Sequence, residues 1–149
     1  MGRRRPPSRD KEAEESVRAV YLDLAARPID RSCELRTDCC RFRITGKVPQ
    51  LTRGEALVLA RGLRASGRRN LPQRDDGSCP LLDPLTSRCI AYDHRPFGCR
   101  THFCAPAGGP LSRRDVIDLI RRLEDIDALL GGDGARAIQG ALADAISTI

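Results

Sequence analysis

The chain has 149 residues, seven of which are cysteine, and carries a net charge of +6. A chain of this length predicts one domain with an ordinary core that does not depend on a metal for stability. It contains no apolar run near the roughly 20 residues that span a bilayer, and residues 1–11 lack the apolar segment of a secretory signal. We therefore expect a soluble, cytoplasmic protein with no membrane partner.

Residues 1–9 are arginine, proline and polar residues, a composition that predicts a disordered basic tail. We expect residues 10–149 to form one domain. The first helix is predicted over residues 10–26, where Pro28 follows and ends the run. Its apolar positions recur at helical spacing and are Ala13, Val17, Val20, Tyr21 and Leu24.

The pattern Thr52-x-x-Glu55 is a capping box and predicts a second helix that ends near Gly67. Residues 71–77 read as a loop. Two short strands are expected at residues 79–82 and 88–92, because five turn-rich residues separate them. This small hairpin would bring Cys79 and Cys89 into one neighbourhood.

The C-terminal region, residues 112–149, predicts a helical hairpin. Ser112-x-x-Asp115 resembles a capping box, Gly131-Gly132 closes the first helix, and Asp133 is placed to cap the second. A joint this short predicts two antiparallel helices. The fold class is therefore mainly α with a small β-hairpin, as a single compact domain with a cysteine centre built from loops.

The cysteines are Cys33, Cys39, Cys40, Cys79, Cys89, Cys99 and Cys104. An odd number of them in a chain without an export signal favours metal ligands over disulfides. Four thiolates arranged tetrahedrally suit zinc or an iron–sulfur cluster. Only Cys99-x4-Cys104 has the short spacing of a zinc knuckle, so the pattern predicts a site assembled from separate loops. The alternative is that the thiols are buried, inert small hydrophobes.

Three segments carry a family resemblance. They read Cys39-Cys40-Arg41-Phe42-Arg43-Ile44, Cys79-Pro80-Leu81-Leu82 and Cys89-Ile90-Ala91-Tyr92-Asp93-His94-Arg95-Pro96-Phe97-Gly98-Cys99-Arg100. Residues 33–104 thus resemble the bacterial YkgJ-like cysteine-cluster family of zinc- or iron-chelating domains. The resemblance implies metal chelation by Cys33, Cys39, Cys40, Cys79, Cys89 and Cys99. That family opens with Cys-x2-Cys-x2-Cys-Cys, whereas Arg36 stands at the second position here. Either the remaining thiols make up the site or Cys104, the less favoured ligand, replaces the missing one.

Cysteine-only ligands and the Cys79-Pro80 pair slightly favour an iron–sulfur cluster, and a zinc ion is the alternative. Arg95 and Arg100 flank Cys99 and are candidate hydrogen-bond donors to ligand sulfurs; surface salt bridges are the other interpretation of both. His94 and His102 are the possible imidazole ligands. The metal ion is therefore the expected partner of residues 33–104.

The sequence favours a metal-binding protein with a redox or metal-handling role, and leaves its protein partner unknown. One alternative is a metal-dependent enzyme of group transfer or redox chemistry, although no nucleophile–base pair or phosphate-binding glycine loop commits to a reaction. The other is a zinc-stabilised module that binds nucleic acid or protein. Its candidate contacts are Arg53, Arg61, Arg64, Arg68 and Arg69, in a region where basic side chains outnumber acidic ones.

Overall fold

The structure is a computed structural model that describes residues 8–29, 31, 48–68, 71, 77–102 and 108–149. Its elements, in chain order, are α1 (Arg9–Ala25), β1 (Gln50–Leu51), α3 (Arg53–Ala65), η2 (Tyr92–His94), α4 (Phe97–Thr101), α5 (Arg113–Leu129), β2 (Arg136–Ala137) and α6 (Ile138–Thr148). Helices dominate and the β-structure is small, so the predicted mainly α fold class is confirmed.

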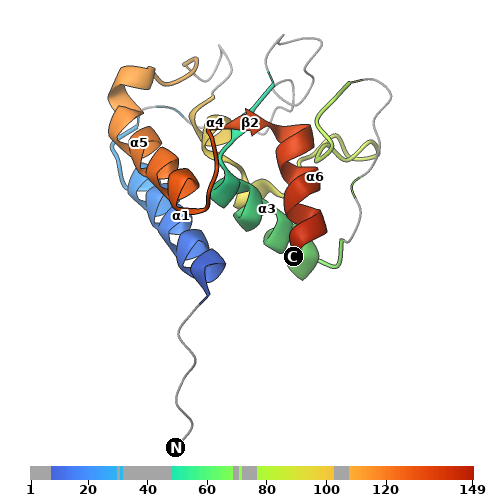
Figure 1. The fold of residues 1–149 in the computed structure, drawn as a ribbon. Helices are drawn as coiled ribbons and strands as arrows, with labels where there is room; N and C mark the ends of the chain where they lie inside the picture. The colour runs from blue at the N-terminus through green and yellow to red at the C-terminus, as the bar shows by residue number, and fades with distance from the viewer. Residues whose placement is uncertain (1–7, 30, 32–47, 69–70, 72–76, 103–107) are drawn as a thin grey trace, which may run out of the picture.

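Helix α3 is the central element of the fold, with α1 and α5 packed on one side and α6 on the other (Figure 1). Two apolar clusters correspond to these two sides. One joins α1 and α5 to Val58 of α3 and to Phe97 of α4. The other joins α3 to α6 and to the segment that contains Cys79, Leu81 and Leu82. The central helix is therefore buried along most of its length.

The start of α3 is the capping box that the sequence predicts. The Thr52 side chain accepts a hydrogen bond from the Glu55 backbone N–H, and the Glu55 carboxylate accepts one from the Thr52 backbone N–H. The predicted first helix is also present, capped by the Ser8 side chain. Residues 8 and 9 therefore belong to the start of α1 and not to a tail, while residues 1–7 lie outside the described residues.

The predicted antiparallel pairing of the C-terminal helices is wrong. Both α5 and α6 form, but α5 packs on α1 and α3 whereas α6 packs on the far side of α3 (Figure 1). Residues 130–137 carry the chain from one side to the other. The left-handed backbone of Gly131, with φ of 75°, helps to turn the chain at the end of α5.

A strand pair explains why the two helices separate. β2 pairs with β1 in antiparallel register, Gln50 opposite Ala137 and Leu51 opposite Arg136. The Ile138 backbone N–H also donates to the Pro49 carbonyl at 3.0 Å. This pairing holds the start of α6 beside the start of α3, so Asp133 precedes β2 and does not cap α6. Ser112 is the N-cap residue of α5 at the predicted position, but its side chain makes no capping hydrogen bond, so the predicted capping box does not form.

Candidate metal centre and the buried carboxylate beside it

Three of the seven cysteines, Cys79, Cys89 and Cys99, lie in the part of the chain that the structure describes. The other four candidate ligands, Cys33, Cys39, Cys40 and Cys104, lie outside the described residues, as does Arg36.

Cys79 and Cys89 lie in the same loop-built corner of the protein. Cys79 is 4% exposed and its carbonyl accepts from the Leu82 N–H at 3.0 Å, which closes a turn. Leu82 and Cys89 then form an isolated antiparallel bridge, flanked by the Ile90 N–H to Leu81 carbonyl bond of 2.8 Å. The predicted hairpin is thus reduced to one bridge. It nevertheless brings both cysteines against the apolar cluster shared by α3 and α6.

Cys99 lies on α4, the short helix that follows Pro96. Its backbone N–H donates to the Pro96 carbonyl at 3.0 Å, and Pro96 is the N-cap residue of the helical turn on which Cys99 sits. The first residue of this helix, Phe97, is buried in the cluster formed by α1 and α5. Position and orientation of Cys99 therefore depend on how α4 is fixed to the helices beneath it.

The contact that fixes α4 is made by Glu55, which is only 2% exposed. Its Oε1 accepts from the Phe97 backbone N–H at 2.7 Å and from the Tyr21 hydroxyl at 3.1 Å. Its Oε2 accepts from the backbone N–H and from the hydroxyl of Thr52, both at 3.0 Å. Burial raises the pKa of Glu55, and these hydrogen bonds oppose that shift because they stabilise the charged form.

Tyr21 connects this carboxylate to Arg100, the neighbour of Cys99. The Arg100 guanidinium carbon lies 4.2 Å from the centre of the Tyr21 ring. Arg100 also donates to the Arg95 carbonyl at 2.7 Å and to the Asp93 carbonyl at 3.0 Å. Burial raises the pKa of Tyr21 well above its usual value, and the charges of Glu55 and of the Cys99 sulfur add to this rise. The Cys99 sulfur is thus close enough to act electrostatically on this network.

Arg95 has a different set of contacts from Arg100. Its guanidinium carbon lies 3.8 Å from the centre of the Tyr92 ring, and its Nε donates to the Tyr92 carbonyl at 3.0 Å. Arg100, the other arginine predicted to assist the ligand sulfurs, interacts electrostatically with Cys99. Burial lowers the pKa of Arg100.

The two histidines occupy different surroundings. His94 ends η2, and its Nδ1 is buried without a hydrogen-bond partner among the described residues. Burial lowers the pKa of His94, and the positive charges of Arg18 and Arg100 lower it further, while Asp93 opposes them. His102 follows α4 as its C-cap, with its backbone N–H donating to the Gly98 carbonyl at 3.1 Å.

A complete metal centre is not formed by the described residues alone. Within residues 8–29, 31, 48–68, 71, 77–102 and 108–149, no three His, Cys, Asp or Glu side chains gather as a potential metal-binding group. The donor chemistry of Cys79, Cys89 and Cys99 fits zinc or an iron–sulfur cluster. A site of three or four ligands that includes these thiols requires further cysteines from residues 33–40 or Cys104.

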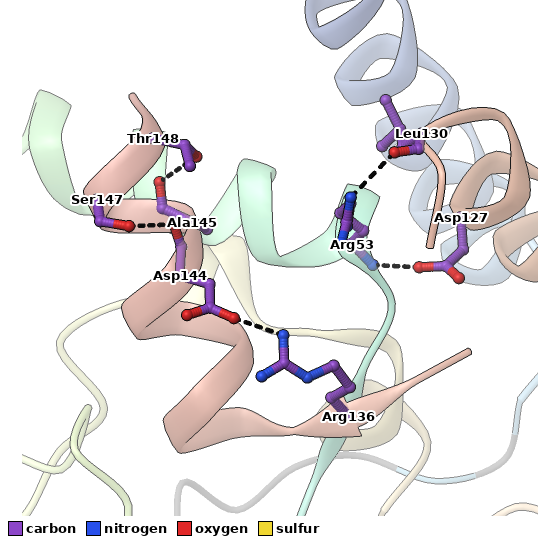
Figure 2. A network of polar contacts seen from close by, with 8 residues as sticks. All are labelled: Arg53, Asp127, Leu130, Arg136, Asp144, Ala145, Ser147 and Thr148. Atoms are coloured by element: carbon purple, nitrogen blue, oxygen red, sulfur yellow. Dashed lines mark hydrogen bonds and ion pairs between the residues drawn. The ribbon is translucent and has the colours of Figure 1, made fainter. Parts of the chain in front are cut away.

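A second polar site, separate from the cysteines, lies where the ends of α5 and α6 approach the start of α3 (Figure 2). Asp127 is 3% exposed, and its carboxylate accepts from the backbone N–H groups of Arg53 at 2.7 Å and Gly134 at 2.9 Å. Across a cleft of about 270 Å³, Arg136 donates to Asp144 at 2.5 Å. Asp127 thus caps α3 from a distant helix.

Sequence reasoning identified Glu55 as a cap and missed its contacts with Tyr21 and Phe97. The sequence does carry one signal: the capping glutamate stands among apolar residues, Leu51, Ala56 and Leu57. Asp127 also had no assigned role, since its partners lie on α3 and in the turn after α5.

No helix formed by the described residues combines the length and the apolarity needed to cross a bilayer. No family model, no curated protein and no solved structure matches the chain.

Proposed function

We propose that the chain is a metal-binding protein that holds an iron–sulfur cluster, or alternatively a zinc ion, through its clustered cysteines. Cys79, Cys89 and Cys99 are the described members of the ligand set. Cys33, Cys39 and Cys40 complete it, and Cys104 is the less favoured candidate, which would be needed only if the remaining thiols do not fill the position that Arg36 leaves. A bound iron–sulfur cluster would supply one-electron chemistry, and a bound zinc ion would supply a structural cross-link.

The observation that supports this proposal best is the way in which backbone contacts fix the cysteine segments. The Leu82–Cys89 bridge holds one segment, and the Glu55 carboxylate holds the start of α4 ahead of Cys99. Inert buried thiols need only apolar neighbours, whereas ligands have to be held in a defined geometry. Arg100 beside Cys99 is also suited to a thiolate centre, because a cation offsets its negative charge.

The described residues support binding more strongly than catalysis. Around Cys99 the side chains are committed to structural contacts: Glu55 accepts four hydrogen bonds, and Arg100 donates to two backbone carbonyls. A metal-handling or one-electron role therefore fits these contacts better than group transfer.

The test is metal analysis of protein purified without oxygen, together with its absorption spectrum. We expect near-stoichiometric metal, because convergent thiolates bind structural zinc with about 10–16 kcal/mol at neutral pH. Broad visible absorption with iron and sulfide identifies the cluster, and a colourless sample with zinc identifies the alternative. Folded protein that contains neither metal and has seven titratable thiols would overturn the proposal.

A further inference from the structure

The two carboxylate oxygens of Glu55 have different partners. Oε2 is bound by the backbone N–H and the hydroxyl of Thr52, and these contacts complete the capping box of α3. A capping box needs only one acceptor oxygen, and glutamine serves in it as well as glutamate. Oε1 takes no part in the cap, because its partners are the Tyr21 hydroxyl from α1 and the Phe97 backbone N–H from α4.

The partners of Oε1 lead directly to Cys99. Phe97 is the first residue of α4, and Cys99 lies two residues further along the same short helix. Tyr21 contacts the same helix, because the guanidinium of Arg100 lies over the Tyr21 ring. The same guanidinium donates hydrogen bonds to the Arg95 and Asp93 carbonyls. One buried oxygen thus restrains both the start of α4 and the Tyr21 ring, over which the Arg100 guanidinium lies.

From these contacts we infer that Glu55 and Tyr21 are positioning residues that hold Cys99 in its metal-binding orientation. The inference rests on the proposed function for the metal, and on the two hydrogen bonds of Oε1 for the orientation of α4. Partners that orient metal ligands without touching the metal typically change its affinity by about 10–100-fold when removed. We expect the Oε1 contacts to have an effect of this size.

The substitution Glu55→Gln separates the two oxygens. With its carbonyl toward Thr52, glutamine keeps the capping box. Its amide nitrogen then faces the Phe97 N–H and cannot accept a hydrogen bond from it. Tyr21→Phe is the milder variant: it removes one donor to Oε1 and keeps the ring beneath Arg100. A matched control is Asp127→Asn, which neutralises another buried carboxylate with two backbone N–H partners and none in a cysteine segment.

The first measurement is the rate at which metal-loaded, full-length protein loses its metal to an excess of chelator. We expect Glu55→Gln to release metal about 10–100-fold faster than the unmodified protein, and Tyr21→Phe to show a smaller increase. Asp127→Asn is expected to release metal at the unmodified rate, even where chemical denaturation shows a similar loss of stability. Equal rates for Glu55→Gln and Asp127→Asn would overturn the inference.

The second measurement does not depend on metal. Metal-free protein is treated with iodoacetamide at one fixed pH, and the alkylation of each cysteine is followed by mass spectrometry. We expect Glu55→Gln and Tyr21→Phe to change the rate at Cys99 and leave that at Cys79 unaltered, whereas Asp127→Asn changes neither. An unchanged Cys99 rate in both variants contradicts the positioning role. A protein that never binds metal refutes the proposed function, and the alkylation rates at Cys99 then decide whether Glu55 and Tyr21 position that residue. If Glu55→Gln does not fold, the Tyr21→Phe variant decides the same question.

Discussion

The imidazole of His94 lies against the backbone of α3 at Gly62. A Cβ atom at position 62 would lie 2.8 Å from His94 Nε2 and closer still to Cγ and Cδ2. Glycine at this position therefore lets η2 approach the central helix, and η2 directly precedes the segment that carries Cys99.

This contact predicts the effect of Gly62→Ala. Alanine normally stabilises a helix by about 1 kcal/mol relative to glycine, but here its methyl group would displace His94 or α3. Overpacking of this kind costs about 1–3 kcal/mol. We therefore expect Gly62→Ala to lower the free energy of unfolding, measured by chemical denaturation. Gly98→Ala in α4 is the control and should be neutral or stabilising, because a Cβ built there has no atom of the described residues within 4 Å, its chain neighbours and own helix backbone aside.

His94 also predicts a dependence of stability on pH. Its pKa is lowered in the folded protein by burial and by Arg18 and Arg100, with Asp93 opposing them. The unfolded chain binds a proton near the ordinary pKa of about 6.5, and the folded protein does so only at lower pH. Above the unfolded pKa, His94 is neutral in both states and does not affect the free energy of unfolding. As the pH falls from the unfolded pKa toward the folded one, the unfolded chain binds the proton first, so the free energy of unfolding decreases.

Denaturation of the unmodified protein and of His94→Gln across this range checks the pH prediction. We expect the loss of stability between about pH 7.5 and about pH 5.5 to be smaller in His94→Gln. The pKa of Glu55 and that of Glu14 are both raised by burial, and these groups act in the opposite direction on acidification, so the comparison of the two proteins isolates His94. Identical profiles would show that His94 is not the responsible group.

Substitution of the cysteines distinguishes ligands from buried apolar residues. We expect Cys79→Ala, Cys89→Ala and Cys99→Ala each to lower metal content, and to destabilise metal-loaded protein more than metal-free protein. Cys104→Ala should have the smallest effect on metal content. If the metal-loaded and metal-free proteins lose equal stability at all four positions, the thiols act through packing alone.

The nucleic-acid alternative predicts binding through the arginines of α3 and of the residues that follow it. Arg61 forms an ion pair with Glu14 at 3.0 Å, whereas Arg64 and Arg68 line a groove with Ile146 and Ile149 of the α6 end. Two arginines beside a small groove are a poor match for a continuous phosphate backbone. We expect no binding of a labelled duplex at low salt. Salt-sensitive binding that is weakened by Arg64→Ala with Arg68→Ala, and unaffected by Arg61→Ala, would restore this alternative.

Local sequence patterns predicted the helices well. The Thr52–Glu55 capping box and the apolar periodicity of residues 10–26 each depend on residues within one or two helical turns. The arrangement of α5 and α6 could not be predicted in this way. It follows from the pairing of β1 with β2, two-residue strands too short to give a periodic signal.

The candidate site shows the same limit. Composition alone singled out the cysteines. The second role of Glu55 depends on Tyr21 and Phe97, which reach it from α1 and α4 across 34 and 42 residues of sequence. Contacts of that range leave no pattern in a single sequence, so a capping residue and an anchoring residue look alike.

The pairing of β1 with β2 also has a consequence for the order of folding. Part of the apolar cluster that covers one side of α3 comes from α6, which is synthesised long after α3 itself. Until α6 emerges, the cluster that contains Leu59 and Leu63 lacks this part, and nascent chains with exposed apolar helices associate readily. Such a high separation between contacting residues also slows folding, because a long loop must close first. A ribosome stalled before residue 138 should therefore hold a chain whose α1–α3 half is formed but still protease-sensitive.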